Sequence, residues 1–146
     1  VTLLDLGLSG CEAVGAIKCL EHLFKEMKSF AMENNLYLHM NASTRTILSW
    51  SSHADYPTGF WFKGADTVVV IKFLIWKYTG LLESVAERNN ADYLNEILNC
   101  LNAANDFMST LYRSGLFLSR LRLTRVVRVG KAMLSSYSLC ARAAFH

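Results

Sequence analysis

The sequence predicts an all-α fold, an antiparallel bundle of about four or five helices. Apolar residues recur at three- and four-residue steps in long segments, and only short connections separate the helical segments after residue 66. The alternative left open is an α+β fold with a small antiparallel sheet, because several segments alternate or are rich in β-branched residues. Its strands would be Leu36–Met40, Thr44–Trp50, Thr67–Ile71 and Arg120–Val129.

The first long helix is expected to start at Ser9 and to end near Asn34-Asn35. Ser9-Gly10-Cys11-Glu12 has the form of a capping box, in which the serine accepts from the N3 amide and the glutamate reaches back to the cap amide. An amphipathic pattern follows, and asparagine can adopt the left-handed conformation that ends a helix. The apolar positions are Val14, Ile17, Leu20, Phe24, Met27 and Ala31.

Residues 36–50 give a mixed signal for regular structure, and a loop follows them. Either a hairpin across Asn41-Ala42-Ser43 or a short helix over Ser43–Ser52 fits residues 36–50. Residues 51–66 contain Pro57 and two glycines and are predicted to be the main loop. Aromatic side chains in a loop either fold back onto the core or form a contact surface, so we expect an interaction loop here. Its rings are Tyr56, Phe60, Trp61 and Phe62.

Two helices are expected between residues 66 and 113. Asp66 is a predicted cap for a helix from Thr67 to about Arg88, although the Thr67–Ile71 run favours a strand. Asp92 or Asn90 caps the next helix, which runs through Arg113 with a clear apolar face. Gly115 follows as a natural stop.

The last 40 residues are basic and can be interpreted as helix or strand. All 12 acidic residues lie at or before Asp106, so residues 1–106 carry a net charge of −4 and residues 107–146 carry +7. Arg120-Leu121-Arg122-Leu123 alternates like a strand, whereas residues 132–144 look helical. Either geometry makes a basic stripe, which indicates an anionic partner or an internal contact with the acidic part. On a helix, Arg113, Arg120, Arg128, Lys131 and Arg142 would project within about 80° of one another.

Length and composition predict a single helical domain over residues 1–146. Because the chain begins at Val1 rather than Met, we expect a domain excised from a larger protein or a processed chain. Hydrophobic residues make up 52% of the chain and charged residues 18%, which excludes a disordered chain. Four cysteines among apolar neighbours are expected to be free thiols, so we expect an intracellular protein, cytoplasmic or nuclear. The longest apolar run, Val68–Trp76, is interrupted by Lys72 and is too short to span a membrane.

No residue pattern predicts catalysis, a metal or a cofactor. Cys19 and His22 are spaced to share a metal, but no second pair completes a four-ligand site. His53 and Asp55 have the residue types of a hydrolytic site, yet a triad is defined by geometry and no catalytic motif accompanies them. The sequence therefore predicts a protein that is not an enzyme.

The predicted function is a protein–protein interaction or oligomerisation module, a scaffold that binds a partner protein or a second copy of itself. A mean hydropathy of +0.21 with few charges suggests that apolar surface meets another chain. The alternative is RNA or DNA binding through the C-terminal arginines, which can hold phosphates by bidentate hydrogen bonds. The basic segment lacks the clean hydrophobic half that membrane attachment needs. The expected partner- or anion-binding residues are Arg113, Arg120, Arg122, Arg125, Arg128 and Lys131.

Overall fold

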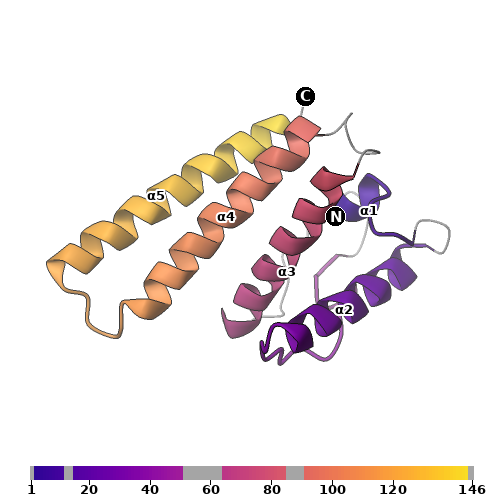
Figure 1. Ribbon diagram of the computed structural model, residues 1–146, viewed down its shortest axis with the longest axis horizontal. Helices are drawn as coiled ribbons and strands as arrows, with labels where there is room; N and C mark the ends of the chain where they lie inside the picture. Colours follow the sequence, from indigo (N-terminus) through magenta and orange to yellow (C-terminus); the bar gives the residue numbers. More distant parts are fainter. Residues whose placement is uncertain (1, 12–14, 51–63, 85–90, 145–146) are drawn as a thin grey trace. The chain divides into compact units, whose positions relative to one another are not determined.

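The structure is a computed structural model that describes residues 2–11, 15–50, 64–84 and 91–144 (Figure 1). All regular structure in these residues is helical: α1 (Thr2–Asp5), α2 (Ala16–Glu33), α3 (Gly64–Glu83), α4 (Ala91–Arg113) and α5 (Arg120–Ala143). The predicted all-α class is confirmed, and the α+β alternative is wrong, because none of its four segments is a strand. The chain forms two compact units, Val1–Phe73 and Leu74–His146. The single domain stays a prediction.

Helix α2 begins later than the capping box indicates. Its first residue is Ala16, after Gly15, and no side chain caps it. Ser9 is buried, and Gly10 has φ +74°, a left-handed conformation that cannot continue into a right-handed helix. The end of α2 is as predicted. Asn35 has φ +53°, and the next amide, that of Leu36, donates to the Ala31 carbonyl at 2.8 Å, which completes a Schellman motif.

Residues 36–50 form neither the hairpin nor the helix that the sequence allows. Residues 45–49 make one turn, in which the Trp50 amide donates to the Arg45 carbonyl at 2.9 Å. Thr44, rather than Ser43, accepts from the Ile47 amide at the start of this turn. The Arg45 guanidinium carbon lies 5.0 Å from the centre of the Trp50 ring, and that ring is buried, so the turn is fixed by its last side chain.

Asp66 does not cap α3 as predicted but ties the start of α3 to the preceding segment. The helix begins two residues earlier, at Gly64, and Asp66 is only 1% exposed. Its Oδ1 accepts from the His39 amide at 2.7 Å, and His39 Nδ1 lies 3.2 Å from the same oxygen. A carboxylate in the first turn also interacts favourably with the helix dipole. The contact joins two segments 27 residues apart.

Removing this carboxylate is expected to destabilise the first unit. Asp66→Ala should lower the free energy of unfolding by about 2 kcal/mol, because the His39 amide loses its acceptor. Asp92→Ala is the matched control, since Asp92 also lies in the first turn of a helix but is exposed, and it should cost about 0.5 kcal/mol. Urea denaturation followed by circular dichroism measures both. Equal losses would show that the Asp66–His39 contact contributes nothing.

The core of the first unit gathers around α2 and the start of α3. The rings of Phe30 and Phe73 meet edge to face with their centres 5.9 Å apart. The other core side chains come from α1, α2, the turn before residue 51 and α3. These are Leu3, Leu8, Cys19, Leu20, Met27, Ala31, Trp50 and Val69. Cys19 is buried as expected, and its thiol donates to the Cys11 carbonyl at 2.7 Å.

The second unit contains a long antiparallel helical hairpin made of α4 and α5. The two helices pack along their length and are joined by a turn at residues 114–119 (Figure 1). α4 ends at Arg113 as predicted, and Gly115 has φ +75°, which turns the chain away from the helix axis. Gly130 faces the Phe107 ring so closely that an added Cβ would lie 3.1 Å from it. Glycine at this position therefore lets the two helices approach each other closely.

Candidate interaction surface

α5 leaves large apolar side chains exposed although it packs against α4. None of its 24 residues is fully buried. The exposed large apolar residues of α5 are Leu121, Leu123, Val127, Leu134, Tyr137 and Leu139. Burying such side chains is favourable in proportion to the apolar area removed from water. This helix therefore has apolar surface that its packing against α4 does not bury.

Four of these residues form one continuous stripe along the helix. At 100° per residue, Leu123, Val127, Leu134 and Tyr137 fall within about 80° of one another. They span 14 residue steps, about 21 Å of helix. We call these four residues the apolar stripe. Leu121 and Leu139 lie on the opposite edge of α5 and are not part of it.

A line of positive charge lies beside the apolar stripe. Arg120, Arg128, Lys131 and Arg142 are exposed and also fall within about 80° of one another, next to the stripe on the helical wheel. We call these four residues the basic line. None of them makes an ion pair with a residue in the described part of the chain. The charge asymmetry allowed an internal contact between the basic residues and acidic helix faces. No such contact is seen for the basic line among the described residues.

The other predicted arginines lie apart from this line. Arg122 Nη1 donates to the Ser114 carbonyl at 3.0 Å, just after the end of α4, so this guanidinium stabilises the turn of the hairpin. Arg113 is the last residue of α4, whereas the basic line lies on α5. The expectation that Arg113 shares one helical face with the basic line is therefore wrong, because no continuous helix joins them. Arg125 is exposed on another face of α5.

The turn of the hairpin carries an apolar cluster that the sequence reasoning missed. Leu116 is 97% exposed and Phe117 is 90% exposed, and Leu118 beside them is also exposed. Arg113 precedes this cluster and Arg120 follows it. We call Leu116, Phe117 and Leu118 the apolar tip. Three large apolar residues directly after a helix-ending glycine were the available signal, because turns are usually polar.

Cys100 and Cys140 face each other across the hairpin. Burial raises the pKa of both thiols. The neighbouring thiol raises the pKa of Cys100 further, and the Glu96 carboxylate raises that of Cys140. All four cysteines of the chain are free thiols, as expected. A raised pKa keeps both thiols neutral near pH 7 and slows their reaction with electrophiles.

The hairpin is expected to lose stability in alkaline solution. Because the thiol pKa values are higher in the folded protein than in the unfolded chain, folding favours the protonated forms. The contribution is complete below the ordinary thiol pKa of about 8.5 and is lost as the pH rises above it. Urea midpoints measured from pH 7 to pH 10 should fall less for Cys100→Ala/Cys140→Ala than for the parent. Parallel pH profiles would contradict this.

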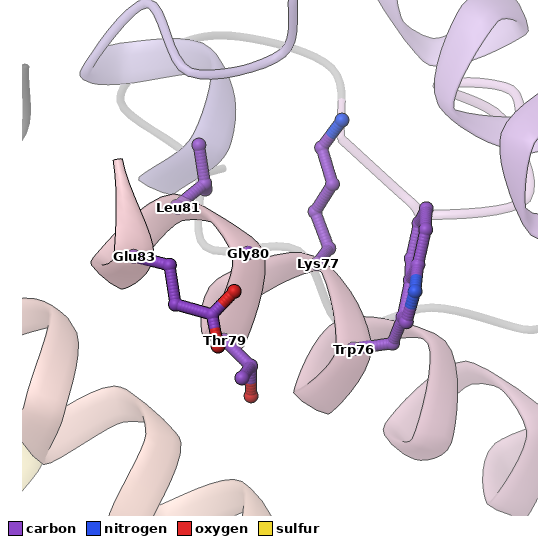
Figure 2. A pocket seen from close by; sticks show the side chains of 6 residues that line it. All are labelled: Trp76, Lys77, Thr79, Gly80, Leu81 and Glu83. Atoms are coloured by element: carbon purple, nitrogen blue, oxygen red, sulfur yellow. The ribbon is translucent and has the colours of Figure 1, made fainter. Parts of the chain in front are cut away.

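The remaining candidates give no assembled site. The interaction loop of Tyr56, Phe60, Trp61 and Phe62, together with His53 and Asp55, lies outside the described residues. A hollow of about 430 Å³ lies against the end of α3, but Figure 2 shows Trp76 and Lys77 directed to one side and Thr79 and Glu83 to the other. His22 is exposed, and no cluster of three metal-ligating side chains occurs in residues 2–11, 15–50, 64–84 and 91–144.

No helix in the described part of the chain is both long enough and apolar enough to cross a membrane. Searches with protein-family models, among curated proteins and among solved structures found no match to this chain.

Proposed function

We propose that the chain is a protein–protein interaction module that binds an amphipathic helix of a partner protein along α5. One observation carries the proposal: α5 packs against α4 and still presents the apolar stripe to solvent. Leu123, Val127 and Leu134 recur at the four- and seven-residue steps by which helices pack side by side. A third helix laid against the stripe would bury it.

The positive charge beside the apolar stripe favours a partner helix with negative charge along the facing edge. The basic line flanks the stripe, and no acidic residue occurs after Asp106. A partner with an acidic edge matches this charge, whereas a basic edge is repelled. A second copy of α5 is the poorer fit, because an antiparallel pair of identical helices places equivalent edges together and would bring the two basic lines face to face.

The test uses two designed helical peptides that share an apolar face and differ in their edge. The peptide with a glutamate edge should bind and the one with a lysine edge should not, as measured by fluorescence anisotropy. Val127→Glu/Leu134→Glu should weaken binding at least about tenfold by placing charge in the buried stripe. The matched control is Leu121→Glu/Leu139→Glu, which changes the same number of apolar residues on the opposite edge. Equal losses in the two variants would contradict the proposal.

The oligomeric state decides between a foreign helix and a second copy. Light scattering during size-exclusion chromatography should give a mass near 16.4 kDa at low and at high salt. A mass near twice this value at both salts would replace the foreign partner with a copy of the same chain. The Val127→Glu/Leu134→Glu variant would then be monomeric if the stripe is the interface.

Nucleic-acid binding is the second candidate, favoured by one specific observation. Arg120, Arg128 and Lys131 are exposed on one face without an ion pair in the described part of the chain. If this face holds phosphates, affinity for a DNA or RNA duplex falls steeply with salt because counterions are released. Arg128→Glu/Lys131→Glu would then abolish binding without changing stability. Purified protein free of bound nucleic acid at low salt, judged by its 260/280 nm ratio, would exclude this candidate.

A further inference from the structure

The turn of the hairpin places strongly exposed apolar side chains between two arginines. The apolar tip contains the two most exposed large apolar residues of the chain's described part, Leu116 at 97% and Phe117 at 90%. It lies at the turn between two antiparallel helices (Figure 1), so it is one end of the hairpin. Arg113 ends one helix and Arg120 begins the other, which places one cation on each side of the tip.

We propose that the apolar tip inserts into the surface of a membrane rich in anionic lipids, with Arg113 and Arg120 against the lipid phosphates. Leu116 and Phe117 would enter the boundary between headgroups and acyl chains, where apolar side chains leave water without requiring a shaped pocket. The arginines remain at the level of the headgroups and bind phosphate through hydrogen bonds and charge. No acidic residue follows Asp106, so nothing in this segment repels the surface.

This geometry differs from a helix that lies flat in the membrane surface. A flat helix needs one hydrophobic half, which α5 lacks because its exposed apolar residues occupy two edges. Insertion by the tip needs only the few residues at the turn. Arg122 strengthens the arrangement, because its hydrogen bond to the Ser114 carbonyl holds the turn in place between the helices. The surface used is also separate from the apolar stripe that carries the proposed helix binding.

A nucleic acid and a second protein fit this end of the hairpin less well. Phosphate binding needs the arginines but gains nothing from the aliphatic side chains of Leu116 and Leu118 beside them. A protein partner would need a pocket shaped to the turn of the hairpin, whereas a fluid lipid layer adapts to the shape of the turn. Charge complementarity with anionic lipid and the apolar character of the tip together favour the membrane.

Vesicle co-sedimentation of the full chain tests the proposal. The protein should bind phosphatidylcholine vesicles that contain roughly a third phosphatidylserine and should not bind pure phosphatidylcholine. Binding should weaken strongly between about 0.1 and about 1 M NaCl, as the Debye length falls from ~10 to ~3 Å. Leu116→Ala/Phe117→Ala should lower the partition coefficient at least about tenfold. Arg113→Ala/Arg120→Ala should lower it about twentyfold.

The matched control separates this proposal from helix binding by the stripe. Val127→Glu/Leu134→Glu should leave vesicle binding within about twofold, because these residues lie outside the tip and the vesicle surface contacts only the turn. Undiminished vesicle binding by Leu116→Ala/Phe117→Ala would overturn the inference. So would a parent protein that binds a DNA duplex but not the phosphatidylserine vesicles, because the arginines would then act without the apolar tip.

Discussion

Phe73→Ala is expected to lower the free energy of unfolding of the first unit by about 4 kcal/mol, the largest loss among the substitutions considered. The Phe73 ring is almost completely buried and meets Phe30 edge to face at 5.9 Å. Truncation removes the apolar burial, the aromatic contact and the packing of α2 against the start of α3, and it leaves a cavity. Urea denaturation followed by far-ultraviolet circular dichroism measures the loss.

The control for this prediction is the same substitution at an exposed phenylalanine. Phe117→Ala should change the free energy of unfolding by less than about 0.5 kcal/mol, because the ring is 90% exposed. A loss near that of Phe73→Ala would mean that the turn is part of a core. The apolar tip would then be unavailable to any ligand, so the control also tests the surface on which the membrane inference depends.

Leu94→Ala is expected to destabilise the second unit by about 3 kcal/mol. Leu94 lies in the first turns of α4 and has no exposed surface. Leucine-to-alanine changes at such positions cost the transfer free energy of the removed atoms and a further amount for the cavity. Leu121→Ala on α5 is the matched control, because Leu121 is 82% exposed and should cost little. Thermal unfolding midpoints of the two variants should differ by several degrees.

A small difference between these leucine variants would contradict the burial of Leu94 in α4 and the exposure of Leu121 on α5. It would require either that α4 is not buried where Leu94 lies or that α5 turns Leu121 inward. The second case would also move the apolar stripe, because its residues have fixed angular positions relative to Leu121 on one helix. The comparison therefore checks the fold and the candidate surface together.

The helices were predictable from the sequence where one face is apolar over several turns. The bodies of α2 and α4 follow this pattern, and their ends at Glu33 and Arg113 follow from the asparagine and glycine residues just after them. The start of α2 was not predictable, because Ser9 has the chemistry of a cap but is buried seven residues before the first residue of the helix. A capping box indicates hydrogen bonds that a helix can use, and tertiary burial decides whether it does.

The strand-like segments show the opposite conflict. Thr67–Ile71 and Arg120–Val129 favour strands by composition, yet both lie inside helices. The helix propensity penalty of a valine or threonine is only a few tenths of a kcal/mol, so packing of a helical face easily exceeds it. In α5 the Ser119 cap and the contact with α4 provide that packing and a defined start.

The positive charge of the candidate surface was predictable from the sequence, but the separate roles of its arginines were not. Charge asymmetry located the basic residues, and helical phase gathered Arg120, Arg128 and Lys131 as expected. The role of Arg122 at the end of α4 depends on a turn whose geometry no periodicity describes. The pairing of Cys100 with Cys140 depends on the register of two helices, which residues 40 positions apart do not reveal.

The one-sided packing of α5 has a consequence for how the free protein fluctuates. A helix without a fully buried side chain opens locally at a lower free energy than its neighbour, so the amide hydrogens of α5 should exchange with solvent faster than those around Leu94 in α4. A ligand that covers α5 closes these openings and restricts the whole helix. Its binding would therefore slow exchange at amides that it never touches, and part of its affinity would be spent on ordering the helix.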